Sequence, residues 1–197
     1  MTAILIVCEG NVCRSPYVER VLQARLDAVA PGRFHVSSAG TAATAGAPAF
    51  PRSAEAAQRH GADLEGFAST PLTAGLLAGT DLVLTMERAH RAAVLDLAPS
   101  LLRRTFTLRE FGRLVRPLLE QDDVTEDFWE TFPRLVARSR LATTPATPED
   151  DDVDDPVRGD SIDHDRMCAT TDAAMDAVVA CASRAAEGAG RARTAGA

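Results

Sequence analysis

A cysteine and an arginine six positions apart lie near the start of this 197-residue chain, in Cys8-Glu9-Gly10-Asn11-Val12-Cys13-Arg14-Ser15-Pro16. A thiolate attacks phosphorus readily, and a guanidinium binds two oxygens of a phosphate with its planar fork. The apolar residues 3–7 predict a buried strand, and Ser15-Pro16 predicts the N-cap and first residue of a helix. Because helix N-termini attract anions, the segment predicts a phosphate site with a nucleophile at its floor.

The loop itself carries further signals for anion binding. Gly10 can adopt backbone angles closed to other residues, which would turn successive amides toward a bound anion. These amides, the helix end and Arg14 all favour a thiolate at Cys8 at neutral pH. The alternative is a buried structural cysteine beside a surface arginine, which the succession of strand, glycine, Ser-Pro and helix disfavours.

The pattern Cys-x5-Arg-Ser-Pro directly after an N-terminal apolar strand resembles the low-molecular-weight protein-tyrosine phosphatases. The resemblance implies a single α/β domain with a four-stranded parallel sheet flanked by helices, and the phosphate-binding loop after the first strand. It also implies that Cys8 forms a cysteinyl-phosphate while Arg14 binds the phosphate. The residues implied to bind phosphate or support the loop are Glu9, Gly10, Asn11, Val12, Cys13, Ser15 and Ser38.

Several of these residues have individual roles by resemblance. Ser15 hydrogen-bonds the thiolate and helps it depart from the phosphoenzyme, in addition to capping the helix. Asn11 holds the loop through its side chain, with Ser38 as its partner. Cys13 either closes a disulfide with Cys8, which shields the thiolate from over-oxidation, or is a small buried filler.

Cleavage of a phosphate ester also needs a proton for the leaving oxygen. In the family an Asp-Pro on a mobile loop before the last helix provides it, and Asp155-Pro156 matches that position. Asp154 precedes this pair, so either aspartate is a candidate, and we favour Asp155. The alternative is a turn that carries two solvated aspartates.

The expected walls of the site depart from the family. The Asp-Pro pair is followed by Val157 and Arg158, where relatives that act on phosphotyrosine usually have aromatic residues, and the stretch after Ser-Ala-Gly-Thr also lacks the expected aromatic. Tyr17 and Phe50 are the candidates for part of an aromatic wall. Relatives that remove phosphate from arginine have threonine at the position of Val12, so the aliphatic residue favours the tyrosine-type branch.

The composition fits one compact enzyme domain. With 46% hydrophobic residues, 197 residues suffice for a full core, while a net charge of -7 without a basic stripe disfavours nucleic acid as a partner. The absence of lysine excludes Schiff-base chemistry and a lysine-bearing nucleotide loop. The N-terminal residues do not show the charged region followed by an apolar region that is typical of a signal peptide, and no apolar run is long enough to cross a membrane. These features predict a cytoplasmic protein without a membrane partner. The four cysteines and four histidines lack metal-ligand spacing, so we expect neither metal nor cofactor.

Strands and helices are expected to alternate along the chain, as in parallel sheets. We predict helices at 16–30, 87–97 and 165–187, and strands at 34–38, 81–86 and 104–108. The resemblance covers most of residues 1–112 and resumes at about 154–186. It makes residues 1–187 a phosphatase domain with an insertion at about 113–153, followed by a disordered tail at 188–197.

The expected insertion contains two recognisable pieces. Phe128, Trp129, Phe132 and Leu135 predict a helix, which Trp129 would anchor to the body of the domain. The run Glu149-Asp150-Asp151-Asp152 is read as a solvated mobile linker, because a calcium loop would need a glycine that is missing here.

Three other functions deserve comparison. An arsenate reductase of the same fold would relay a disulfide through a cysteine pair in mid-chain, but no cysteine lies between residues 14 and 167. A non-catalytic phosphate-binding module would not need Cys8, Arg14 and Asp155 together, and an adaptor would act through the insertion. The sequence therefore favours a phosphomonoesterase, foremost a protein-tyrosine phosphatase acting on phosphorylated protein. It specifies neither the physiological target nor the oligomeric state.

Overall fold

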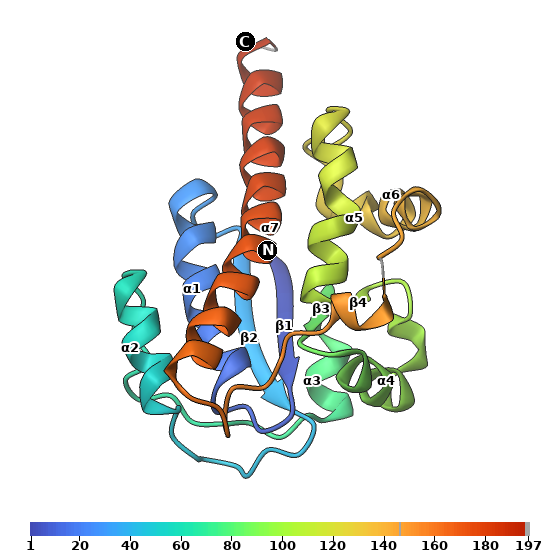
Figure 1. Ribbon diagram of the computed structural model, residues 1–197. Coiled ribbons are helices and arrows are strands. Elements are labelled where there is room, and N and C mark those ends of the chain that lie inside the picture. The colour runs from blue at the N-terminus through green and yellow to red at the C-terminus, as the bar shows by residue number, and fades with distance from the viewer. Residues whose placement is uncertain (146, 196–197) are drawn as a thin grey trace.

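A parallel sheet with helices on both faces forms the centre of the computed structural model, which describes residues 1–145 and 147–195 (Figure 1). The strand order is β2-β1-β3-β4, and all three pairings are parallel. The strands are β1 (Thr2–Cys8), β2 (Phe34–Gly40), β3 (Leu82–Thr85) and β4 (Thr105–Thr107). The helices are α1 (Arg14–Val29), α2 (Pro51–Arg59), α3 (Ala74–Ala78), α4 (Arg88–Leu97), α5 (Leu108–Glu120), α6 (Phe128–Ala142) and α7 (Ser161–Ala195), with short 3-10 helices η1 (Pro99–Leu101) and η2 (Pro148–Asp151).

The sheet separates two apolar cores. On β1, Ile4 and Ile6 lie in the core shared with α1, α5, α6 and α7, whereas Leu5 and Val7 lie in the core shared with α3 and α4. Successive side chains of a strand point to opposite faces, so a strand covered on both faces is apolar throughout. This explains the continuous apolar run that predicted β1, and it confirms the predicted four-stranded α/β fold.

The first helix begins earlier than predicted. It starts at Arg14 rather than Pro16, and no side chain caps its N-terminus. Ser15 therefore does not act as the N-cap, because its hydroxyl is engaged with Cys8 and Asn11 instead. The change leaves the amides at the start of α1 without a side-chain cap.

Residues 113–153, expected as an insertion, contribute to the main core. The helix α5 packs along α7, and Gly112 lets the two approach, since a Cβ there would lie 3.3 Å from Cα of Ala174. Trp129 anchors α6 by packing edge-to-face on Phe34, with ring centroids 5.0 Å apart. The buried apolar side chains that α5 and α6 add to this core are Leu108, Phe111, Leu114, Val115, Leu118, Phe128, Phe132 and Val136.

The last helix extends farther than the sequence predicted. It continues to Ala195 and projects beyond the sheet at the top of Figure 1. Residues 196–197 of the expected tail lie outside the described residues. Within the described ranges, no helix is both long and apolar enough to cross a membrane.

Candidate active site

The loop between β1 and α1 lies at the edge of the sheet where its parallel strands end. Cys8 is 2% exposed and Arg14 only 1%. The end of β2 packs tightly against the loop, because a Cβ on Gly40 would lie 2.5 Å from the carbonyl oxygen of Glu9 and 2.8 Å from the amide nitrogen of Asn11. Both neighbours are backbone atoms, so only glycine fits at this position of β2.

Hydrogen bonds to the segment after β2 orient the loop backbone. The carbonyls of Cys8, Glu9 and Val12 accept hydrogen bonds of 2.6–3.0 Å from amides of that segment. By contrast, the amides of Gly10, Val12 and Cys13 make no hydrogen bond within the described part of the chain. Unpaired amides beside a helix N-terminus form a site for an anion.

Asn11, rather than Gly10, adopts the left-handed backbone conformation, with φ of 50°. Asparagine tolerates this conformation better than most residues, and here its side chain is fully used. Its Nδ2 donates to Oγ of Ser15 at 2.9 Å and to Oγ of Ser38 at 2.7 Å, while its Oδ1 accepts from the amide of Thr70 at 2.7 Å. The expectation for Gly10 is thus wrong, and the side chain of Asn11 supports the loop conformation.

Two donors converge on the sulfur of Cys8. The amide of Asn11 lies 3.3 Å from Sγ, and Oγ of Ser15 lies 2.9 Å from it. Because Asn11 donates to the oxygen of Ser15, the hydroxyl hydrogen of Ser15 is free to point at the sulfur. This arrangement suits a sulfur that carries negative charge before and after a reaction.

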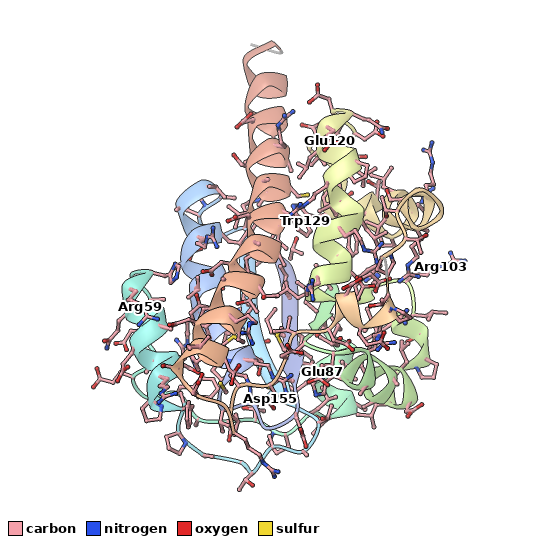
Figure 2. The ribbon with its side chains drawn as sticks, viewed as in Figure 1. Arg59, Glu87, Arg103, Glu120, Trp129 and Asp155 are labelled. Carbon is pink, nitrogen blue, oxygen red and sulfur yellow. The ribbon has the colours of Figure 1, made fainter. Side chains whose placement is uncertain are left out.

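Arg14 is held by three acceptors from two distant segments. Its Nη1 donates to the Glu87 carboxylate and, at 2.9 Å, to the carbonyl of Val153, while Nη2 donates to Oδ2 of Asp155 at 2.6 Å. Burial opposes the charge, but the hydrogen bond with Glu87 and the nearby Asp155 outweigh it and raise the pKa of Arg14. Figure 2 shows Glu87 and Asp155 at the lower end of the sheet. The guanidinium is therefore charged and oriented at neutral pH.

A cavity of about 410 Å³ opens over the loop. Cys8 and Arg14 line it together with Asp155, so the three residues for which the sequence predicted chemistry meet in one place. Asp154 instead borders a neighbouring cavity beside Met167.

Comparison with known proteins identifies the family. The model of the low molecular weight phosphotyrosine protein phosphatase family matches residues 3–129. The chain belongs to this family. The match extends past residue 112, where the resemblance was expected to lapse, and it includes α5.

Individual relatives agree with this assignment. The low molecular weight protein-tyrosine-phosphatase Etp of Escherichia coli K12 is 39% identical over 126 residues, which cover 64% of this chain and 77% of Etp. The solved structure of Vibrio vulnificus Wzb in complex with benzylphosphonate superposes with a TM-score of 0.64 at 27% identity, covering 90% of this chain and 97% of Wzb. The YwlE arginine phosphatase of Geobacillus stearothermophilus has a TM-score of 0.66 over 91% of each chain, but its 22% identity supports the fold alone.

Cys13, the second loop cysteine of this phosphatase, is buried and protonated. Its sulfur accepts a hydrogen bond from Ser53 at 3.3 Å, and Ser53 lies 3.2 Å from Nε2 of His164 on α7. Burial raises the pKa of Cys13 to about 11. Cys8 and Cys13 are free thiols here, so the disulfide implied by family resemblance stays a prediction.

The walls of the phosphatase cavity are aliphatic and polar. Val12, Ala42, Val157 and Arg158 line it. Tyr17 is fully buried, and its hydroxyl donates to Oδ1 of Asp172 at 2.9 Å. The expectation that Tyr17 forms part of an aromatic wall is therefore wrong. Phe50 contributes its amide to the loop, while its ring stacks on His164 with centroids 6.4 Å apart.

Sequence reasoning missed Val153, whose carbonyl binds Arg14, and three other residues that support the site. Glu87 binds Arg14, Gly40 permits the close approach of β2, and Thr70 binds Asn11. Glu87 carried a usable signal, because it directly follows a predicted strand of a parallel sheet, where such strand ends gather. Gly40 and Thr70 had no comparable signal, since the need for them depends on how separate segments pack.

Proposed function

We propose that this protein is a protein-tyrosine phosphatase that works through a phosphorylated Cys8. The observation that carries the proposal is the convergence of the Cys8 sulfur, unpaired loop amides and the Arg14 guanidinium on one cavity. Amides and a guanidinium are preorganised donors for the oxygens of a phosphoryl group, whose charge spreads in the transition state. The names of the relatives, including Etp, support tyrosine as the target.

In this mechanism the Cys8 thiolate attacks phosphorus, and the bond to the ester oxygen breaks. Asp155 gives its proton to that oxygen, and the alcohol leaves. Water then attacks the cysteinyl-phosphate after losing a proton to the Asp155 carboxylate, and the thiolate leaves with the hydroxyl of Ser15 as its donor. The cycle ends with inorganic phosphate, a free thiolate and a protonated Asp155, as it began.

Two features support tyrosine over arginine as the phosphorylated residue. Val12 presents an aliphatic side chain to the cavity, at the position where family resemblance associates threonine with arginine phosphatases. Val157 and Ala42 add further apolar surface against which a phenyl ring can pack. The substrate we propose is therefore a phosphotyrosine in a protein.

The four free thiols in the chain support a reducing cytoplasmic location.

Hydrolysis of para-nitrophenyl phosphate by the purified protein tests the chemistry, and competition by phosphotyrosine tests the pocket. We expect turnover without added metal, and inhibition by phosphotyrosine that exceeds inhibition by phosphoserine and phosphoarginine at equal concentration. Absence of turnover would refute the enzyme, whereas stronger competition by phosphoarginine would refute the tyrosine assignment.

Replacement of Asp155 by asparagine should reduce phosphotyrosine hydrolysis on the order of a hundredfold, as expected for the loss of a general acid. The effect should be smaller with an activated phenyl phosphate, since a good leaving group needs less protonation. Initial rates with a series of aryl phosphates of graded leaving-group pKa measure all of these effects.

The matched control is Asp154→Asn, which changes the neighbouring carboxylate outside the cavity of Cys8. It should retain most of the activity. If the two variants exchanged their effects, Asp154 would be the acid, and if neither changed the rate, the proton would have to come from another group such as Asp160.

A further inference from the structure

The segment that carries Asp155 is tied to arginines of α4 and α5. We call residues 147–155 the acidic strap; it includes η2 and the run predicted as a solvated linker. Arg88 donates through Nε and Nη2 to Oδ2 of Asp152 at 3.2 and 3.1 Å, and its backbone amide donates to Oδ1 at 2.7 Å. Its Nη2 also donates to Glu149 at 2.9 Å. The linker interpretation is therefore wrong, because these carboxylates are held by ion pairs.

A second set of contacts holds the strap from α5. Arg113 binds the two carboxylate oxygens of Asp151 through Nη2 at 3.0 and 2.8 Å, and its Nη1 reaches Oγ1 of Thr143 at 3.3 Å. Arg109 donates to the backbone carbonyl of Asp152 at 2.8 Å. The side chains of Asp151 and Asp152 are 13% and 22% exposed. The acidic strap is thus held from both α4 and α5, through contacts to its side chains and to its backbone.

The residue after Asp152 connects the strap to the active site. The amide of Val153 donates to the carbonyl of Met86 at 2.8 Å, and its carbonyl accepts from Arg14 at 2.9 Å. Asp155 follows two residues later and binds Nη2 of Arg14. Arg88 directly follows Glu87, the other carboxylate on Arg14, so one end of α4 holds both the strap and the guanidinium.

We infer that Arg88 and Asp152 are positioning residues for the reaction: their ion pair holds the acidic strap so that Val153 and Asp155 stay on Arg14. The inference rests on the proposed function, in which Asp155 is the acid. Without the arginines, four consecutive carboxylates would repel one another and extend the segment, and ordering it would cost conformational entropy. Asp155 would then occupy its productive position for a smaller fraction of the time.

The test compares Arg88→Met, Asp152→Asn and the double variant with the parent. Asp152→Asn keeps an oxygen for the amide of Arg88 but removes the charge. Because partly exposed ion pairs are individually weak, we expect kcat for phosphotyrosine to fall about three- to tenfold, with KM nearly unchanged. The fall should be smaller for para-nitrophenyl phosphate, and the double variant should be no slower than the single ones.

Arg103→Met is the matched control, because Arg103 extends from the body into solvent away from the strap (Figure 2). The kcat of Arg103→Met should equal that of the parent for both substrates. Salt screens exposed charges, so added salt should lower kcat of the parent toward that of Arg88→Met while changing the variant less. Arg88→Lys, which keeps the charge without the fork, should lie between the parent and Arg88→Met.

The outcomes distinguish a failure of the positioning role from a failure of the proposed function. Equal kcat for Arg88→Met, Asp152→Asn and Arg103→Met in an active parent background would overturn the positioning role alone. The positioning role would also be overturned if the losses of kcat in the two single variants added up in the double variant. It would be overturned as well if kcat fell equally for phosphotyrosine and para-nitrophenyl phosphate. A parent inactive on both substrates would overturn the proposed function and the positioning role with it.

Discussion

Replacement of Cys8 by serine should reduce hydrolysis of para-nitrophenyl phosphate and phosphotyrosine by a factor on the order of 10⁴ or more, as for the loss of other enzymatic nucleophiles. Serine occupies nearly the same space, but its hydroxyl is not ionised at neutral pH, and the loop offers it no base. The contacts around Cys8 are donors, the Asn11 amide at 3.3 Å and the Ser15 hydroxyl at 2.9 Å. They stabilise an anion but do not remove a proton from serine.

The same variant should still bind phosphate or vanadate, because Arg14 and the loop amides are unchanged. Titration calorimetry with inorganic phosphate measures this separately from turnover. Cys168→Ser is the matched control: Cys168 is a buried cysteine on α7, and burial raises its pKa to about 11. We expect this control to hydrolyse substrate like the parent. Substantial turnover by Cys8→Ser would contradict the cysteinyl-phosphate mechanism.

Replacement of Arg14 by lysine should lower kcat/KM roughly a thousandfold, at the upper end of the effect of removing one oxyanion donor. In the structure Nη1 donates both of its N–H groups, to Glu87 and to Val153, while Nη2 donates one to Asp155, so Nε and the second N–H of Nη2 form the fork that faces a phosphate. A lysine ammonium is a point charge and cannot reproduce this two-pronged arrangement at a phosphate. The variant therefore keeps the charge of the site but loses its geometry.

Arg25→Lys on the same helix is the control for Arg14→Lys. Arg25 pairs with Asp176 on α7, and both side chains are partly exposed. Its replacement should leave kcat/KM near that of the parent, while circular dichroism checks that both variants fold. If Arg14→Lys retained more than about a tenth of the parent activity, a general positive charge would suffice and the fork would not matter.

Local sequence was informative about the loop because its residues are adjacent in the chain. An apolar strand, a short loop and a helix start brought Cys8 and Arg14 together whatever the remaining fold. The alternation of apolar segments likewise predicted the four strands, since a parallel sheet buried on both faces needs continuous apolar runs. Capping was less predictable: the hydroxyl of Ser15 could have bound the helix end, but it binds the sulfur of Cys8 and the side chain of Asn11 instead.

The ion pairs were the part of the structure least predictable from the sequence. The chain contains 21 arginines and 28 acidic residues, so many ion pairs were possible from the sequence. Which of them form depends on the faces that α4 and α5 present to the strap. For the same reason a run of four carboxylates resembled a solvated linker, although Arg88 and Arg113 hold it.

The sequence by itself predicted Cys8 as the nucleophile and determined the phosphate-binding loop and the α/β class, because each depends on residue type and short-range order. Only the tertiary structure decided what completes the site. Glu87 and Val153 reach Arg14 from 73 and 139 residues away, and Gly40 supports the loop from the neighbouring strand, whereas Asp155, at 141 residues, was predicted only through family resemblance. Such contacts follow from the packing of strand ends and helices, which brings together segments whose spacing in the sequence carries no signal of their meeting.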